Sequence, residues 1–168
     1  MWLHSRLVIG PSRIHGQGLF AVDDIANGTI LMKLAGHLVS SAELAHLIAR
    51  ARSQPEQYVD TITVYEDAHL VIPARTKIHF GNHSCDPNAW HVGPYDIAAR
   101  RDVRAGEEVT IDYATSSGEQ GFSMMCNCGS SLCRHEITSE DWRRPELQQR
   151  YGDHWVPALQ GRIARSQG

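Results

Sequence analysis

Three cysteines near the C-terminal end of the 168-residue chain, Cys126, Cys128 and Cys133, form a C-x-C-x4-C cluster. Two thiolates two residues apart can bind one ion from a single turn, and the third returns after the Gly129-Ser130 bend. Structural zinc takes four soft ligands in a tetrahedron, and Cys85 is the one cysteine that remains. The pattern predicts one structural Zn²⁺ bound by these four residues; the alternative is incidental thiols and a buried cysteine.

A second polar cluster surrounds Cys85, in the segment Phe80-Gly81-Asn82-His83-Ser84-Cys85-Asp86-Pro87-Asn88. Its Asn, His and Ser side chains offer several hydrogen-bond donors and acceptors at one place. The segment is either a hydrogen-bonded turn or part of a binding site. A His-Cys pair also suits a thiol nucleophile, but a cysteine that binds zinc is not available for that role.

Short strand patterns separated by Gly and Asn turns must position these clusters. They predict strands at 7–9, 18–22, 29–34, 97–103 and 109–113 and a β-hairpin over 58–72. A change of period predicts a helix over 40–52, capped by Ser40 or Ser41. Apolar residues spaced near four predict helix over 140–163, divided at Pro145 and Gly152-Asp153. We expect a mainly β body with one inserted helix and a helical C-terminus.

The bulk composition is that of one compact globular domain, with 42% hydrophobic and 21% charged residues. A net charge of −3 does not suit a nucleic-acid-binding polycation, so no direct nucleic-acid partner is expected. The N-terminus lacks an apolar signal core and no apolar run is long enough to cross a membrane. We therefore expect a cytoplasmic protein without a membrane partner, in which clustered cysteines indicate metal ligands rather than disulfides.

Four motifs, in this order, resemble those of the SET-domain protein-lysine methyltransferases with a post-SET zinc motif, in the compact form of bacterial members. They are Ile14–Ala21 (IHGQGLFA), Asn82–Asn88 (NHSCDPN), Gly106–Tyr113 (GEEVTIDY) and Cys126–Arg134 (CNCGSSLCR). The resemblance implies a β-clip type fold of small sheets, with the segment 82–85 threaded through a loop as a pseudoknot. It also implies a SET domain at 7–115, a post-SET zinc-binding segment at 122–135 and a C-terminal helical extension at 138–165.

The resemblance further implies transfer of a methyl group from S-adenosyl-L-methionine to the ε-amine of lysine in a protein, which leaves S-adenosyl-L-homocysteine. Tyr113, which ends the third motif, is implied as the catalytic residue. The residues implied to bind the cofactor are His15, Gly16, Gln17, Gly18, Tyr58, Asn82, His83 and Asn127. The alternatives are a tight turn at Gly16 and Gly18 and an ordinary sheet position for Tyr58.

Two positions depart from the family pattern in the region that would line the channel for the substrate lysine. Leu34 stands where the family often has tyrosine, and Ile111 stands where it often has phenylalanine or tyrosine. Both changes remove aromatic or hydroxyl groups from the channel wall. A wider and less polar channel predicts that di- or trimethylation is possible; the same losses would also suit weak activity.

The expected partner is a protein or peptide that bears lysine, such as a histone-like, ribosomal or other basic protein. We expect a monomer or weak homodimer. One alternative is a catalytically silent SET module that binds a protein partner. Another is a structural adaptor that only binds zinc, which would leave the glycine motif and Tyr113 unexplained.

In the tail, Trp142, Tyr151 and Trp155 are expected to pack the helices onto the domain, unless they form a peptide-binding wall or a dimer contact.

Overall fold

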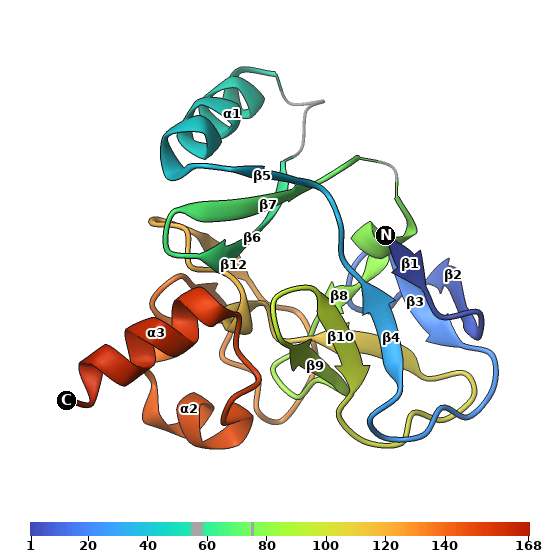
Figure 1. The fold of residues 1–168 in the computed structure, drawn as a ribbon. Coiled ribbons are helices and arrows are strands. Elements are labelled where there is room, and N and C mark those ends of the chain that lie inside the picture. Colours follow the sequence, from blue (N-terminus) through green and yellow to red (C-terminus); the bar gives the residue numbers. More distant parts are fainter. Residues whose placement is uncertain (55–58, 75) are drawn as a thin grey trace.

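The computed structural model describes residues 1–54, 59–74 and 76–168 (Figure 1). Tyr58, predicted as a cofactor contact, lies outside the described residues. Within those ranges the strands form three sheets, of eight, three and two strands. The predicted architecture, mainly β with an inserted helix and a helical C-terminus, is confirmed.

The eight-stranded sheet has the order β1-β4-β10-β9-β11-β3-β2, with β8 paired to β11 off this path. The pairing of β8 with β11 is parallel, with Asn82 opposite Thr110 and His83 opposite Ile111. This pairing brings the second and third motifs side by side. The strands are β1 (Trp2–Leu3), β2 (Leu7–Pro11), β3 (Gln17–Ala21), β4 (Ile30–Lys33), β8 (Asn82–His83), β9 (Ala89–Val92), β10 (Asp96–Ala99) and β11 (Glu108–Ile111).

A three-stranded sheet and the inserted helix form a second unit above the large sheet (Figure 1). The helix α1 (Ser41–Ser53) begins with a capping box, in which Ser40 accepts from the backbone of Glu43 and the Glu43 side chain accepts from the backbone of Ser40. Ser40 is therefore the cap. Leu44 is the buried residue of α1. The sheet has the order β5-β7-β6, with β5 (His37–Val39), β6 (Asp60–Tyr65) and β7 (Ala68–Ile72).

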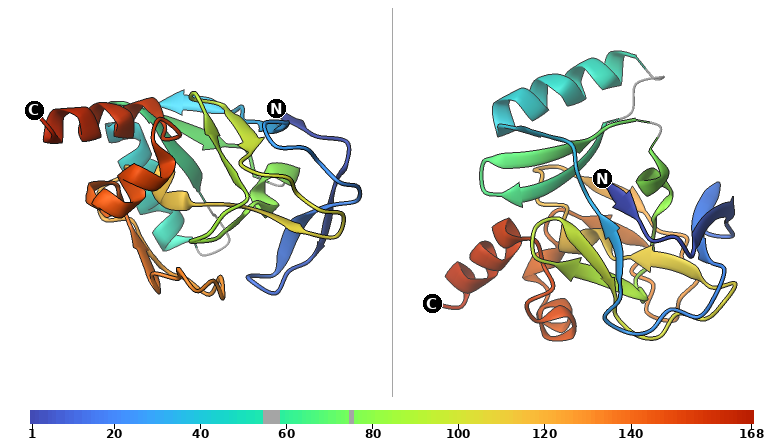
Figure 2. Two further views of the ribbon diagram at one scale, coloured as in Figure 1. Left: turned by 90° about the horizontal axis from the view of Figure 1, so that it is seen from below. Right: turned by 45° about the vertical axis from the view of Figure 1, so that its right-hand side comes forward.

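The C-terminal part continues through a small hairpin and two helices. The strands β12 (Ser123–Met125) and β13 (Glu136–Thr138) flank the cysteine cluster. The helix α2 (Pro145–Tyr151) begins at its proline and stops at Gly152, whose φ of 54° is left-handed; α3 (Pro157–Ser166) follows. In both views of Figure 2 these helices and the β2–β3 hairpin lie at opposite ends of the molecule.

Two predicted strands are shorter than expected. The 97–103 strand ends at Ala99, and Val103 instead pairs with Ile25 in an isolated bridge. The 109–113 strand ends at Ile111, because the Asp112 carboxylate accepts from Ala114 N at 3.0 Å and starts a 3₁₀ turn. The 3₁₀ turns are η1 (Lys77–Phe80), η2 (Tyr113–Thr115) and η3 (Asp141–Arg143).

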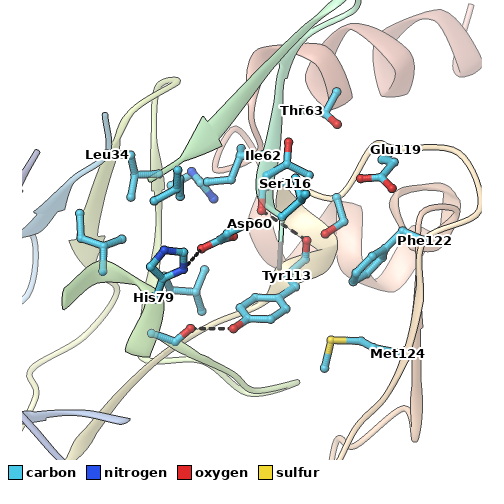
Figure 3. A pocket seen from close by; sticks show the side chains of 18 of the residues that line it. Leu34, Asp60, Ile62, Thr63, His79, Tyr113, Ser116, Glu119, Phe122 and Met124 are labelled. Carbon is cyan, nitrogen blue, oxygen red and sulfur yellow. Dashed lines mark hydrogen bonds and ion pairs between the residues drawn. The ribbon is translucent and has the colours of Figure 1, made fainter. Parts of the chain in front are cut away.

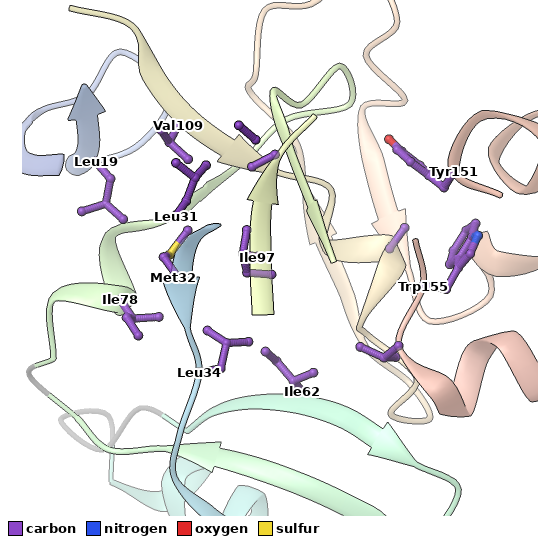
Figure 4. Packing of buried hydrophobic residues seen from close by; sticks show 14 of the residues in the cluster. Leu19, Leu31, Met32, Leu34, Ile62, Ile78, Ile97, Val109, Tyr151 and Trp155 are labelled. Atoms are coloured by element: carbon purple, nitrogen blue, oxygen red, sulfur yellow. The ribbon is translucent and has the colours of Figure 1, made fainter. Parts of the chain in front are cut away.

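The buried core runs from the large sheet to the C-terminal helices (Figure 4). Leu19, Leu31 and Ile97 on the sheet are fully buried, as are Tyr151 at the end of α2 and Trp155 after it. Together with the buried Trp142, these aromatic side chains join the tail to the domain. None of the helices in the described ranges combines the length and the apolar character that a membrane span requires.

Candidate functional site

The four cysteines come together at one point of the fold. The Sγ atoms of Cys85, Cys126, Cys128 and Cys133 all lie within 4.8 Å of one another. The Sγ atoms of Cys85 and Cys126 are 3.8 Å apart. A tetrahedral ion with metal–sulfur bonds of about 2.3 Å would place its sulfur ligands about 3.8 Å apart. The arrangement therefore has the size of a four-thiolate metal site.

Backbone N–H groups surround these sulfur atoms. Arg134 N lies 3.3 Å from Cys85 Sγ, Cys128 N lies 3.4 Å from Cys126 Sγ, and His135 N lies 3.4 Å from Cys133 Sγ. Such donors stabilise thiolates and orient them toward a cation. Burial raises the pKa of Cys85 to about 11, so this thiol keeps its proton unless a metal ion replaces it.

The glycine motif forms a loop that Asn82 and Glu108 hold in place. Asn82 Nδ2 donates to Gln17 O at 2.9 Å and to Glu108 Oε1 at 2.7 Å, and Ser12 Oγ donates to Glu108 Oε2 at 2.9 Å. A Cβ atom at Gly18 would overlap Glu108 Oε1, so glycine is needed for this bridge. The second and third motifs thus fix the shape of the first.

A cavity of about 620 Å³, here called the loop cavity, lies beside this segment. Gly18 is buried and does not line it. The predicted site residues that do line the loop cavity are His15, Gly16, Gln17, Asn82, His83, Tyr113 and Asn127. Residues from four separate motifs therefore face one space.

A second cavity of about 500 Å³, the aliphatic cavity, opens between the large sheet, α1 and β6 (Figure 3). Leu34 and Ile111, the two predicted channel residues, line it. The wall is otherwise rich in Ile and Met side chains. The loop cavity and the aliphatic cavity share three lining residues, His79, Tyr113 and Met124, and therefore meet at these side chains.

Tyr113 is held at this junction by its neighbours. Its hydroxyl donates to Gly81 O at 2.8 Å, and its backbone N donates to His83 Nδ1 at 3.2 Å. Since Nδ1 accepts, the proton of the neutral ring is on Nε2, which lies 3.4 Å from Cys85 Sγ. Burial lowers the pKa of His83 to about 4, so the ring stays neutral near pH 7. His83 thus links the Tyr113 backbone to the cysteine cluster.

A buried ion pair behind Tyr113 was not predicted. Arg134 binds both oxygens of the fully buried Asp112 carboxylate at 2.7 Å, and Tyr151 Oη donates to Asp112 Oδ2 at 2.7 Å. Arg134 Nε also lies 3.0 Å from Asp141 Oδ2. Asp112 and Arg134 each adjoin a predicted site residue in the sequence, but no spacing pattern indicates that they meet.

The junction also carries a close pair of side chains, His79 and Asp60, that the sequence did not suggest. Nδ1 of His79 lies 2.7 Å from the Asp60 carboxylate, and Nε2 lies 2.7 Å from Pro73 O. Burial raises the pKa of the Asp60 carboxyl, and the neighbouring His79 acts in the opposite direction. His91 also lines the aliphatic cavity, and its buried Nδ1 has no hydrogen-bond partner among the described residues.

Comparisons with known proteins agree with this arrangement. The SET domain family model matches residues 16–114. The chain is 31% identical over 144 residues to putative histone-lysine N-methyltransferase 1 of Plasmodium falciparum, which covers 76% of this chain and 2% of that protein. It is 33% identical over 139 residues to histone-lysine N-methyltransferase trithorax of Drosophila virilis, and this match covers 73% of this chain and 3% of that protein.

A third relative is the H3 lysine-4 specific histone-lysine N-methyltransferase of Schizosaccharomyces pombe, 31% identical over 144 residues, with 77% of this chain and 15% of that protein covered. The chain thus spans between 2% and 15% of the length of these three relatives. The family match covers more than half of the chain, from the glycine loop to the residue after Tyr113. The chain belongs to the SET-domain family.

Proposed function

We propose that this chain is a protein-lysine N-methyltransferase, which transfers a methyl group from S-adenosyl-L-methionine to the ε-amine of a lysine in another protein. The observation that carries the proposal is the position of Tyr113, where the loop cavity meets the aliphatic cavity. One cavity is lined by the glycine loop and polar groups, and the other by aliphatic side chains that suit a lysine stem. The names of the relatives support a lysine acceptor.

The loop cavity has the volume of a cofactor site, and its donor set fits an amino acid joined to a nucleoside. S-adenosyl-L-methionine, when bound, supplies an electrophilic methyl group on its sulfonium, and S-adenosyl-L-homocysteine is the product. His15, Gly16, Gln17, His83 and Asn127 would contact it. Because Asn82 already donates to Gln17 O and Glu108, its role and that of Gly18 would be to fix the loop. Tyr58 keeps its proposed role from the resemblance.

The aliphatic cavity would prepare the nucleophile. Free lysine titrates near pH 10.4, and an apolar wall disfavours the ammonium form and so lowers its pKa. Tyr113 Oη donates its proton to Gly81 O, and a phenolic oxygen of this kind can also accept an N–H of the amine. Alignment and desolvation would then supply most of the rate, with no strong base needed.

We also propose that Cys85, Cys126, Cys128 and Cys133 bind one structural Zn²⁺. Four thiolates fill a tetrahedral site and leave no open position, which is the pattern of structural zinc. The ion would tie the segment after β8 to the segment between β12 and β13. On this basis we propose a SET domain at 7–115, a post-SET segment at 122–135 and an extension at 138–165, in a monomer or weak homodimer.

The proposed substrate is a lysine-bearing protein of basic character, such as a histone-like or ribosomal protein. The test is incubation of the purified chain with tritiated S-adenosyl-L-methionine and a mixture of histones and lysate proteins, followed by mass spectrometry of the labelled bands. We expect methyllysine in the wild type. We expect Tyr113→Phe to retain cofactor binding by calorimetry but to lose about 100-fold or more in turnover.

Two outcomes would contradict the proposal. Cofactor binding without label in any protein would support the silent SET module instead. Equal single-turnover rates for the wild type and Tyr113→Phe would remove Tyr113 from the chemistry.

A further inference from the structure

The wall of the aliphatic cavity contains two carboxylates, Asp60 and Glu119 (Figure 3). Asp60 is paired with His79, whose Nδ1 lies 2.7 Å from the carboxylate. Glu119 stands in the segment between η2 and β12, and in the part of the chain that the structure describes its carboxylate has neither an ion-pair nor a hydrogen-bond partner. The two acidic groups therefore differ: one is paired and one is open to the cavity.

The surroundings of Glu119 favour a cation. The Glu119 side chain is half-buried, and this burial raises the pKa of its carboxyl. The positive charge of Arg52 acts in the opposite direction. Arg52 is exposed near the end of α1 and lines the same cavity, but among the described residues it forms no ion pair with Glu119. A carboxylate that has lost part of its hydration is stabilised when a cation with hydrogen-bond donors comes into contact with it.

Glu119 is not placed to hold the reacting amine. The methyl acceptor must lie at the junction of the two cavities, which His79, Tyr113 and Met124 line and Glu119 does not. Figure 3 shows Glu119 beside Phe122 and on a different side of the cavity from His79. A carboxylate next to the amine would also keep it protonated and unreactive. The cation that Glu119 suits is therefore a different group from the target lysine.

We propose that Glu119 binds a second basic side chain of the substrate, an arginine or lysine close in sequence to the methylated lysine. The inference rests on the proposed function. In an extended peptide, residues two apart point to the same side and are about 7 Å apart, so a long basic side chain can reach a group on the same cavity wall. Glu119 would then select substrates by their basic context, whereas Tyr113 acts on any lysine that reaches it.

The test uses short peptides with one lysine and one arginine, moved from two positions before the lysine to two positions after it, with alanine versions as the reference. We measure Kd by fluorescence anisotropy and kcat and KM by methyl transfer. We expect the wild type to prefer at least one arginine peptide by about 10-fold in Kd and KM. Glu119→Gln should abolish this preference and leave kcat on the alanine peptide within about twofold. Glu119→Lys should shift the preference to glutamate in place of arginine.

Two variants make the result specific. Asp23→Asn removes one negative charge at an exposed site outside both cavities and should keep the arginine preference. In an Arg52→Gln background, Glu119→Gln should still abolish it, which separates substrate binding from an internal Glu119–Arg52 pair. Thermal unfolding confirms that each variant is folded.

An arginine preference that survives Glu119→Gln would overturn the inference. So would a fall in kcat of equal size on arginine and alanine peptides, since that would mean a role in positioning the target lysine. If the wild type transfers no methyl group, the proposed function fails, but the anisotropy measurements still decide whether Glu119 recognises a basic side chain.

Discussion

Tyr151 donates its hydroxyl proton to Oδ2 of Asp112 over 2.7 Å, and Asp112 directly precedes Tyr113. The contact joins helix α2, outside the family match, to the segment that carries the proposed catalytic residue. Two further hydrogen bonds join the C-terminal extension to the residues that follow Tyr113. Val156 N donates to Thr115 O at 3.0 Å, and Arg162 Nη1 donates to Gly118 O at 2.9 Å. The C-terminal extension thus supports the segment behind Tyr113.

Tyr151→Phe should lower the free energy of unfolding by about 1–3 kcal/mol, because it removes one hydrogen bond to a buried carboxylate and leaves the ring packing intact. Urea unfolding measures the loss. Tyr65→Phe, at a tyrosine 46% exposed, is the matched control and should change stability by less than about 0.5 kcal/mol. Equal effects of the two substitutions would mean that the Asp112 contact adds nothing.

Arg134→Ala should lower the free energy of unfolding by about 3–5 kcal/mol, which is more than the effect of Tyr151→Phe. The reason is that it leaves the Asp112 carboxylate buried without its cation. The Arg134 side chain is 5% exposed and that of Asp112 is 0% exposed. Arg143→Ala breaks an exposed pair with Glu140 and should cost less than about 1 kcal/mol. In an Asp112→Asn background the cost of Arg134→Ala should shrink, and a cost that stays the same would refute the pairing argument.

The sequence predicted much of this site because its residues lie in short motifs. Cys126, Cys128 and Cys133 are local, and the count of four cysteines indicated Cys85. Contacts set by the tertiary fold carry no such signal. Asp60 contacts His79 in the wall of the aliphatic cavity, and Arg134 contacts Asp112, without any spacing that links them in the sequence. Strand β9 was missed because Trp90 and His91 interrupt a clear apolar alternation.

The end of β11 shows why element boundaries were harder to predict. Val109 to Tyr113 has the composition of one strand, but the Asp112 side chain competes for Ala114 N and turns the chain at that point. The turn brings Tyr113 to the cavity junction instead of leaving it in the sheet. Asp112 therefore both ends the predicted strand early and positions the proposed catalytic side chain of Tyr113.

His91 should make stability depend on pH. Its full burial lowers its pKa to about 4 from 6.5, with the charge of His154 acting in the same direction. Between these pH values the unfolded chain binds more protons than the folded chain. The stability that the neutral His91 contributes is therefore complete above pH 6.5 and is lost as pH falls toward 4. Between pH 7.5 and 5.5 the wild type should lose about 1 kcal/mol more than His91→Phe in urea unfolding. Parallel pH profiles for the two proteins would contradict this.

Metal removal should loosen the segment between β12 and β13. We expect about one zinc per chain by elemental mass spectrometry, in keeping with a four-thiolate site, and loss of that zinc in Cys128→Ser. His135→Asn is the control: its N–H contacts Cys133 Sγ, its ring is not a proposed ligand, and asparagine tolerates its φ of 65°. Chelation should increase hydrogen exchange over residues 123–138 in the wild type. Full metal content in Cys128→Ser would refute the ligand set.

The aliphatic wall at Leu34 and Ile111 should set how many methyl groups are added. Both side chains line the cavity that ends at Tyr113, and neither offers a hydroxyl that could fix a water beside the amine. The wild type should therefore give di- or trimethyllysine on a good substrate. Leu34→Tyr and Ile111→Tyr each narrow the cavity and add a hydroxyl, so each should shift the product toward monomethyllysine. Val8→Tyr, at an exposed site outside the cavity, should leave the product unchanged. Product masses over time measure the shift, and a wild type that stops at monomethyllysine would refute the argument.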